Sequence, residues 1–427
     1  MPEKLALFGG LPVRSNAYYP NKLGEEEKRL ALSVLDEGVL SGFAAKADEQ
    51  FYGGKYVREL EVLFCRRFGA KYAVSFNSAT SGLHGALLAA GVGPGDEVIV
   101  PPYTMSATAT AVLMCHAVPV FVDIEPNMFC MNPALIESHI TKNTKAIIPV
   151  HLFGLPAEMD SIMEIAECHK LIVIEDNAQA SGAFYKGHPT GAIGHMGVFS
   201  LNRHKNIHCG EGGVVLSKDP DLTERLQLCR NHGELVLFLK KGNNKNDDIV
   251  GYNYRLSELH AAVAIGQLKR IDELNNTRSY LSNYLTERLS EIPYISSPKI
   301  REGCTHVYFL YPMLYNREKL GIHRDTLVKA IVSEGVHASN YAAPIYMYPI
   351  YKGINKKADN FKKVFPEYEG CPNYKDGICP ETERLYNDKM LFTNICRSPN
   401  TVSEVDELIA TLKKIEANKE VLLDFEK

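Results

Sequence analysis

One lysine of this sequence stands in a setting that could make its amine reactive. Lys205 lies in a predicted polar turn, directly after Arg203 and His204 and shortly before a glycine-rich segment at residues 210–213. Neighbouring cations disfavour the protonated amine, and a neutral amine can act as a nucleophile. This setting would suit covalent chemistry at Lys205, but the spacing alone favours a basic surface turn.

A carboxylate and an amide follow an apolar run at residues 171–175. Asp176 ends this run, and Gln179 comes three residues later. In open α/β sheets, ligands bind outside the carboxyl ends of the strands. The carboxylate could be held beside a cationic ring nitrogen there, and the amide could reach the same ligand. An aspartate that only caps the next helix explains the pattern equally well.

Two further segments lie where a loop enters a predicted helix. Residues 78–81 read Ser-Ala-Thr-Ser, and small hydroxyl residues at a helix start present free amides to an anion. Such a segment could hold a phosphate, but taken alone it favours simple capping of the helix by Ser or Thr. Asn253 and Arg255 open a second helix, where they could serve a ligand, an interface or the helix start alone.

The elements that must position these residues alternate between short apolar runs and helix-period segments. Buried parallel strands are apolar on both faces, so the alternation predicts an α/β layered fold with a mostly parallel sheet. We expect strands at 72–75, 98–100, 118–123, 146–150 and 171–175, and helices at 81–90, 157–168, 221–230, 256–274 and from 401 to the end. Residues 240–248 are expected to form a solvated loop, and a T-x-x-E capping box at 401–404 begins the last helix.

Composition and charge exclude several classes of protein. The 427 residues are 45% hydrophobic and 23% charged, which is typical of a globular protein of two or three domains. A net charge of −4 gives no electrostatic footprint for nucleic acid. The longest apolar stretch, residues 111–122, is too short to cross a membrane. The opening residues lack the pattern of a secretory signal, so we expect a cytoplasmic protein.

The cysteines and histidines do not predict a metal site. Ten cysteines are scattered without a CxxC pair, which favours reduced, core-filling thiols. Cys371 and Cys379 are the closest pair, with no second pair nearby. A zinc site from His204, His208 and Cys209 is disfavoured because nothing indicates a helix at that spacing.

Taken together and in order, these segments resemble the DegT/StrS family of pyridoxal-phosphate (PLP) sugar aminotransferases. The likeness spans almost the whole chain, and the set in register is specific although no single piece is. The matching segments are FGGLPVR (8–14), GVGPGDEVIVPPYT (91–104), TKAIIPVHLFG (144–154), IEDNAQASGA (174–183), the FS-x4-K spacing that ends at Lys205, GEGG (210–213) and GYNYR-x-SE (251–258).

The resemblance implies a type I PLP-dependent aminotransferase fold. A large domain with a mostly parallel central sheet would span residues 25–275. A smaller α+β C-terminal domain would span residues 276–427, together with residues 1–24. The enzyme would be a homodimer with shared active sites.

The resemblance also implies a role for each site residue. Lys205 would bind the cofactor covalently and shuttle the proton during transfer. Asp176 would pair with the protonated pyridine nitrogen, and Gln179 would hydrogen-bond the cofactor's phenolic oxygen. The phosphate would be held by Ala79, Thr80 and Ser200, and by Asn253 of the neighbouring subunit.

Three positions depart from the pattern of this family. Ala79 replaces a usual glycine, and a methyl group is tolerated there if the backbone angles are ordinary. Met105 stands where an aromatic ring commonly stacks on the cofactor, so we expect a softer sulfur–aromatic contact. Ser181 replaces a frequent histidine. None of these changes is expected to abolish cofactor binding.

The implied reaction moves an amino group from glutamate or glutamine to a keto sugar, which we expect to be nucleotide-linked, or to a keto-cyclitol. Such products feed surface-glycan or antibiotic amino-sugar biosynthesis. The segments GEGG (210–213) and 379–392 are more similar to those of the keto-cyclitol and aminohydroxybenzoate enzymes of this family. Residues 340–344 match a loop that lies near the substrate in relatives. One alternative is a PLP-dependent dehydratase on the same scaffold, which carries histidine in place of Lys205. The other is a non-catalytic regulator, which predicts damaged cofactor residues.

Overall fold

Strands with two apolar faces form the centre of the fold. The computed structural model describes residues 3–15, 23–240, 245–356, 362–365, 367–370 and 372–427. Its seven-stranded sheet has the order β1-β9-β8-β5-β4-β2-β3. Every pairing within the part β8-β5-β4-β2-β3 is parallel. Strand β9 runs antiparallel to both β8 and β1. The strands are β1 Tyr72–Phe76, β2 Glu97–Val100, β3 Val118–Phe121, β4 Thr144–Ile147, β5 Ile172–Asp176, β8 Met196–Ser200 and β9 Gly213–Ser217.

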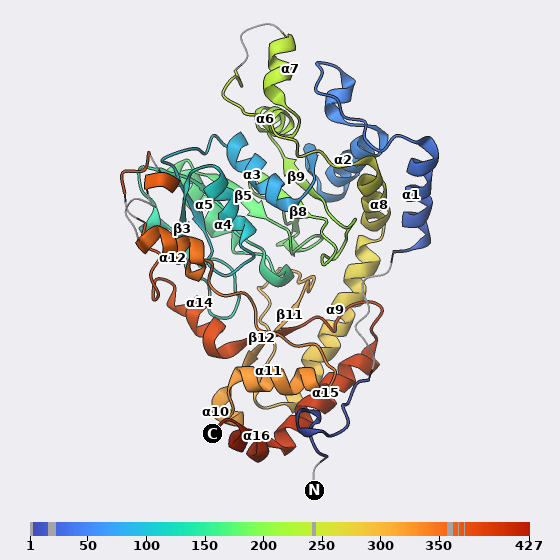
Figure 1. Cartoon of the computed structure of the whole chain (residues 1–427), viewed down its shortest axis with the longest axis vertical. Helices are drawn as coiled ribbons and strands as arrows, with labels where there is room; N and C mark the ends of the chain where they lie inside the picture. Colours follow the sequence, from blue (N-terminus) through green and yellow to red (C-terminus); the bar gives the residue numbers. More distant parts are fainter. Residues whose placement is uncertain (1–2, 16–22, 241–244, 357–361, 366, 371) are drawn as a thin grey trace.

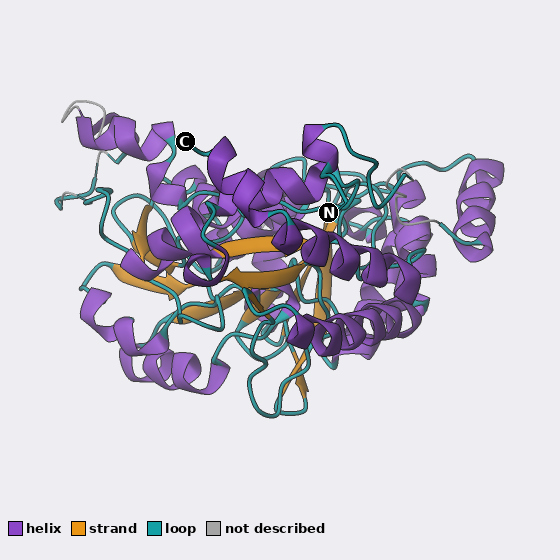
Figure 2. Ribbon diagram, turned by 90° about the horizontal axis from the view of Figure 1, so that it is seen from below, coloured by secondary structure: helices purple, strands orange, loops and turns teal. Residues whose placement is uncertain are grey.

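Helices cover both faces of this sheet, as Figure 2 shows. Neighbouring residues of β8 point to opposite cores: Val198 packs in one cluster with Leu83 and Leu87, and Phe199 packs in another with Phe64. This is the reason the strands are apolar throughout. The helices of this part are α1 Glu25–Glu37, α2 Lys55–Phe68, α3 Ala79–Ala89, α4 Ala107–Met114, α5 Met159–His169, α6 Pro220–Arg230, α7 Gly233–Lys240 and α8 Glu258–Lys269.

A second core lies in the C-terminal part of the chain, at the bottom of Figure 1. The antiparallel strands β10-β11-β12 pack with helices around a cluster that also contains Leu5, so the N-terminal residues join this part. The capping box of Thr401 and Glu404 begins α15 as predicted. The elements of the C-terminal part are β10 Ile295–Ser296, β11 Tyr311–Tyr315, β12 Met390–Thr393, α9 Ile271–Arg288, α10 Arg317–Leu320, α11 Arg324–Ser333, α12 Pro349–Lys356, α14 Pro380–Arg384, α15 Val402–Ala417 and α16 Lys419–Phe425. Of these, α12 packs on the core of the large sheet through Tyr351 and Ile354. A two-stranded ribbon, β6 Phe184–Tyr185 with β7 His188–Pro189, lies after β5.

The predicted strands are all present, and two other predictions need correction. The single helix expected at 256–274 is two helices, because Arg270 leaves the helical conformation (φ −103°, ψ 6°). Apolar spacing continues across that residue, so it could not reveal the break. The predicted solvated loop at 240–248 is anchored at its end, where Asn246 is buried and Arg225 binds Asp248 through both carboxylate oxygens. Residues 241–244 of that loop lie outside the described residues.

The two parts are joined by α9, drawn in yellow in Figure 1. Ile271 at its start packs in the core of the large sheet, whereas Leu281 and Leu285 pack in the C-terminal core. The helix therefore crosses the predicted domain boundary at residue 275, and that boundary stays a prediction.

Candidate active site

Strand pairing brings the predicted site residues to one edge of the large sheet. Ser200 ends β8 opposite Gly213, and Gly213 also lies opposite Phe76 at the end of β1. Asp176 ends the adjacent strand β5, where it is in register with Val198. The ends of β1, β5 and β8 and the start of β9 therefore meet at one edge of the sheet. This is the edge at which α/β sheets bind their ligands.

The segment at residues 78–81 both caps a helix and opens toward this edge. The hydroxyl of Ser78 accepts a hydrogen bond from the amide of Ser81 at 3.1 Å, which makes it the N-cap of α3. Ala79 and Thr80 form the first turn, whose amides have no partner inside the helix. A Cβ added to Gly213 would come within 2.7 Å of the Ala79 nitrogen, so only glycine allows β9 to pass this helix end. The capping and anion-binding interpretations are therefore compatible.

Asp176 is buried and accepts a hydrogen bond at each carboxylate oxygen. Thr108 Oγ1 donates to Oδ2 at 2.8 Å, and the amide of Ala178 donates to Oδ1 at 3.1 Å. Burial raises the pKa of Asp176 above its ordinary value, while these two donors and the Lys205 amine act in the opposite direction. A cationic ligand group placed here would stabilise the ionised carboxylate.

Lys205 shares this site with Asp176, and its amine is shifted toward the neutral form. Burial lowers the pKa of the Lys205 amine to about 8, against a smaller opposing effect of the Asp176 carboxylate. The prediction that Arg203 and His204 cause this effect is wrong, because both side chains are exposed and burial is the main cause. The ring of Phe309 lies over the amine, with 4.4 Å between Nζ and the ring centroid.

Gln179 is buried and fixed at both ends of its amide. Its Oε1 accepts a hydrogen bond from the Phe153 amide at 3.0 Å, and its Nε2 donates to the Tyr341 hydroxyl at 3.1 Å. Tyr341 comes from the C-terminal part of the chain and packs edge-on against Tyr103 and Phe153. The loop at 340–344 therefore reaches the same side of the site as Gln179.

The carboxylate next to Asp176 has a structural task. Glu175 is fully buried and accepts hydrogen bonds of 2.7 Å from the amides of Gly191, Ile193 and Gly194. His151 Nε2 lies 2.8 Å from the same carboxylate, and its Nδ1 accepts from the Ala157 amide. His151 is fully buried, so it packs in the core beside Glu175 rather than lining the site.

Two predicted contributors lie on the surface of the single chain. Met105 is 61% exposed, beside the start of α4 that carries Thr108. Asn253 is exposed as well, and its Oδ1 accepts a hydrogen bond from Arg255 Nε at 2.7 Å. Both side chains are accessible to a ligand or to a second subunit.

Two residues of the site had no signal in the sequence. Thr108 looks like any small residue of an apolar helix, and its bond to Asp176 depends on how α4 sits against β5. Phe309 follows α9 in an apolar run, where nothing indicates that its ring meets Lys205. Contacts between distant segments of this kind carry no local pattern.

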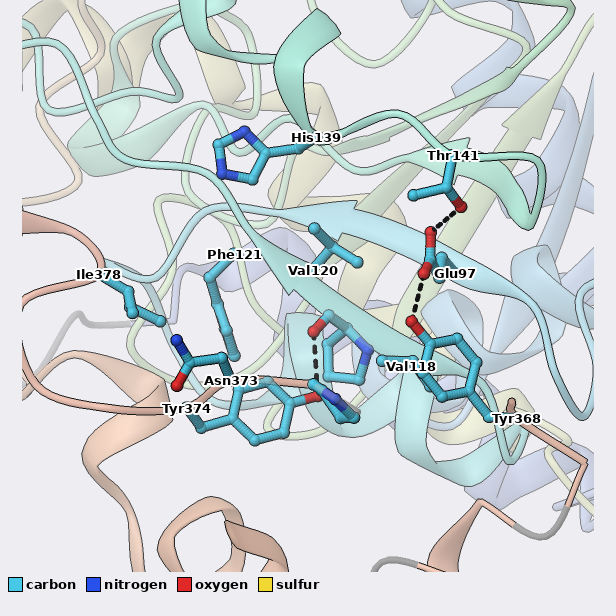
Figure 3. Close-up of a pocket in the computed structure, with 12 residues that line it drawn as sticks. Glu97, Val118, Val120, Phe121, His139, Thr141, Tyr368, Asn373, Tyr374 and Ile378 are labelled. Atoms are coloured by element: carbon cyan, nitrogen blue, oxygen red, sulfur yellow. Dashed lines mark hydrogen bonds between the residues drawn. The ribbon is translucent and has the colours of Figure 1, made fainter. Parts of the chain in front are cut away.

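A cavity of about 290 Å³ lies away from these strand ends, against the edge strand β3. Figure 3 shows Glu97 at its wall, hydrogen-bonded to the hydroxyls of Thr141 at 2.6 Å and Tyr368 at 2.5 Å. Tyr374 donates to the carbonyl of Pro119 on β3 at 3.0 Å. These bonds attach the C-terminal segment to the edge of the sheet. We therefore assign the residues that line the cavity a structural role.

The described residues show no metal site and no membrane helix. No group of three or more His, Cys, Asp or Glu side chains among them could hold a metal ion. The cysteines within the described ranges are all free, and most are buried, as expected for core-filling thiols. Cys371 lies outside those ranges. No helix in the described part is long and apolar enough to span a bilayer.

Comparison with known protein families decides what this arrangement is. Residues 43–369 match the DegT/DnrJ/EryC1/StrS aminotransferase family. The chain belongs to this family. Its members are PLP-dependent aminotransferases, so the chain is an aminotransferase whose cofactor is PLP.

Relatives of this aminotransferase support the same assignment over most of its length. It is 37% identical to the GDP-perosamine synthase of Caulobacter vibrioides over 70% of the chain and 79% of that protein. It is 30% identical to S. venezuelae DesV in complex with a ketimine intermediate, with a TM-score of 0.76 over 92% of this chain and 94% of that one. It is 25% identical to DesI in the presence of its TDP-sugar product, with a TM-score of 0.81 over 99% of each chain. The type I aminotransferase fold is therefore confirmed.

The residues of this aminotransferase fit a PLP molecule at the strand edge. Asp176 is a buried carboxylate with a donor on each oxygen, and it suits a protonated ring nitrogen. The start of α3, left open by Gly213, suits a phosphate. Lys205 provides an amine that is half neutral near pH 8.

Proposed function

We propose that this aminotransferase moves an amino group from glutamate or glutamine to the keto group of a sugar carried on a nucleotide, or of a cyclitol. The product would enter amino-sugar biosynthesis for surface glycans or antibiotics, in the cytoplasm. One observation carries the proposal: a readily deprotonated amine, Lys205, shares the strand edge with the buried carboxylate of Asp176.

The proposed site assigns a task to each residue near the cofactor. Asp176 holds the ring nitrogen, and Gln179 donates to the phenolic oxygen. Met105 packs on the ring in place of an aromatic side chain. Ala79, Thr80 and Ser200 hold the phosphate, and Asn253 reaches it from the partner subunit of a homodimer. In this scheme residues 25–275 bind the cofactor, and residues 276–427 with 1–24 form the smaller domain.

Lys205 performs the proton transfers of the reaction. Bound PLP supplies an aldehyde that takes up an amino group and a ring that withdraws electrons from the adjacent carbon. The neutral Nζ of Lys205 would accept the proton that leaves the α-carbon of the amino-acid donor and pass it to C4′ of the cofactor. In the second half of the reaction, Nζ would take a proton back from C4′ and give it to the former keto carbon of the acceptor. Asp176 remains ionised throughout.

One site then serves two substrates in turn, which predicts ping-pong kinetics. The keto substrate has to be a sugar or a sugar-like ring. The printed activities of relatives support this class, because one makes GDP-perosamine and another has a TDP-sugar product. Those activities belong to the relatives, and the nucleotide-linked substrate of this chain is our proposal.

The test is a substrate screen that follows the absorbance of the bound cofactor. Glutamate or glutamine should convert the yellow enzyme to its pyridoxamine form, and the correct keto sugar or keto-cyclitol should restore the yellow colour. A purified enzyme whose colour responds to none of the amino donors and none of the keto acceptors would overturn the proposal. NMR spectroscopy of the sugar product then gives the position that is aminated.

The same screen separates the dehydratase and regulator alternatives. A dehydratase of this scaffold lacks the reactive lysine, whereas Lys205 is present and its pKa is lowered. A regulator would show damaged cofactor residues, whereas Asp176 is buried with donors on both oxygens. Loss of water from a hydroxyl-bearing keto sugar without amine transfer would favour the dehydratase.

A further inference from the structure

A phenylalanine from the C-terminal part of the chain covers the amine of Lys205. Phe309 lies between α9 and β11, far from the loop that carries the lysine. Its ring centroid is 4.4 Å from Nζ. Phe309 is not among the residues that we propose bind the cofactor.

The turn that presents this ring has an unusual backbone. Tyr308 has a φ of 45°, in the left-handed region that bulky side chains rarely adopt. Its amide donates to Nδ1 of His306 at 2.9 Å, and the two rings stack at 3.9 Å with 9° between their planes. Such a conformation costs free energy and persists only where the surroundings enforce it.

Three other segments hold the turn in place. The Val307 amide donates to the Gly154 carbonyl at 3.1 Å, and Arg278 donates to the Tyr308 carbonyl at 3.3 Å. Asn206, the residue that follows Lys205, donates through Nδ2 to the Val307 carbonyl at 2.9 Å. The loop that carries the lysine therefore also fixes the turn that covers it.

An aromatic ring over an amine can act in two opposite ways. Its electron-rich face attracts an ammonium ion and favours the protonated form. Its apolar bulk excludes water and favours the neutral form. At Lys205 burial is the largest influence on the amine and lowers its pKa, and the ring of Phe309 is part of the packing around that amine.

We propose that Phe309 is a positioning residue for amine transfer, which keeps the Nζ of Lys205 dry and in place. The proposal rests on the role given to Lys205 above, and it adds a residue that acts through that lysine.

The test measures how readily Lys205 is labelled as a function of pH. Brief acetylation with acetic anhydride modifies only neutral amines, and peptide mass spectrometry reads each lysine separately. The full-length enzyme is labelled without cofactor and in its pyridoxamine-phosphate form, in which the lysine is not bonded to the cofactor. Exposed Lys142 serves as the internal reference. The variants are Phe309→Ala, which opens the site to water, and Phe309→Leu, which keeps an apolar cover without a ring.

Lys205 of the unchanged enzyme should show a labelling midpoint near pH 8. Phe309→Ala should raise the midpoint by about one pH unit, which makes labelling at pH 8 about five-fold slower. Phe309→Leu should stay closer to the unchanged enzyme than to the alanine variant. Circular dichroism checks that each variant folds, and Phe309→His, which brings polar nitrogens to the amine, carries the same expectation if the alanine variant does not fold.

An unchanged midpoint in Phe309→Ala would overturn the proposal, because other groups would then keep the amine dry. A lower midpoint in either variant would also overturn it, since the ring would then favour the charged form. These results are separate from the proposed function. An enzyme that never binds PLP at Lys205 would refute the role of the lysine, whatever the labelling shows.

Discussion

Thr108 Oγ1 donates a hydrogen bond of 2.8 Å to Asp176 Oδ2, and this bond joins the first turn of α4 to the end of β5. The donor stabilises the ionised form of a carboxylate whose pKa is raised by burial. Met105, the proposed ring contact, is tied to the same turn because its carbonyl accepts from the Thr108 amide at 3.3 Å. One threonine thus connects the two groups that we propose meet the cofactor ring.

Replacing Thr108 with valine should therefore weaken cofactor binding. The change keeps the shape of the side chain and removes the donor, at a cost of about 1–2 kcal/mol to the ionised carboxylate. We expect about ten-fold weaker PLP binding, measured by fluorescence titration of the cofactor-free enzyme. Thr108→Ser retains the hydroxyl and should bind PLP as the unchanged enzyme does. Equal affinities for the valine and serine variants would refute the role of this bond.

Asp176→Asn should make the cofactor-free chain more stable and should abolish amine transfer. Because burial raises the pKa of Asp176, the cofactor-free folded chain retains its proton to higher pH than the unfolded chain. The contribution of Asp176 to the stability of the cofactor-free chain is therefore fully present below pH 3.8 and is lost as the pH rises through the raised pKa. Asparagine carries no charge, so the variant should be more stable than the unchanged chain at pH 7 while losing transamination.

Urea unfolding of both cofactor-free proteins between pH 4 and pH 7 checks this expectation, because the gain should grow with pH across that range. Lower stability of Asp176→Asn than of the unchanged chain at pH 7 would contradict this expectation, because the fold itself would then favour the ionised carboxylate.

The sequence predicted the strands and the cofactor motifs because both depend on local pattern. Buried parallel strands such as β8 are apolar on both faces, and Asp176 follows directly from the end of such a strand. The cause of the low pKa of Lys205 was not predictable. Arg203 and His204 are visible beside it in the sequence, whereas the ring of Phe309 reaches it only through the packing of the C-terminal part. Thr108 was missed for the same reason.

Gly213→Ala should damage the phosphate end of the site. The new methyl group would lie 2.6 Å from the Ser78 carbonyl and 2.7 Å from the Ala79 nitrogen, so the start of α3 must move. We expect PLP affinity to fall by about ten-fold or more. Gly93→Ala is the matched control, because a Cβ there would meet no heavy atom within 4 Å. Unchanged affinity in Gly213→Ala would place the phosphate elsewhere.

A mixture of inactive variants tests whether Asn253 acts across the subunit boundary. Lys205→Ala and Asn253→Ala homodimers should each be impaired. Random reassortment of their chains forms heterodimers in which one site has both native residues, and this should restore about one quarter of full activity. No recovery after confirmed exchange of subunits would mean that Asn253 serves the site of its own chain, or none.

The central claim is that Lys205 carries the cofactor, and borohydride reduction tests it most directly. The purified enzyme should be yellow, should lose this colour on reduction, and should yield one peptide with the reduced cofactor on Lys205. Lys205→Ala should fold, bind PLP without retaining it after reduction, and fail to transfer an amino group from glutamate. Reduced cofactor on another lysine, or transfer at the normal rate by Lys205→Ala, would contradict the account.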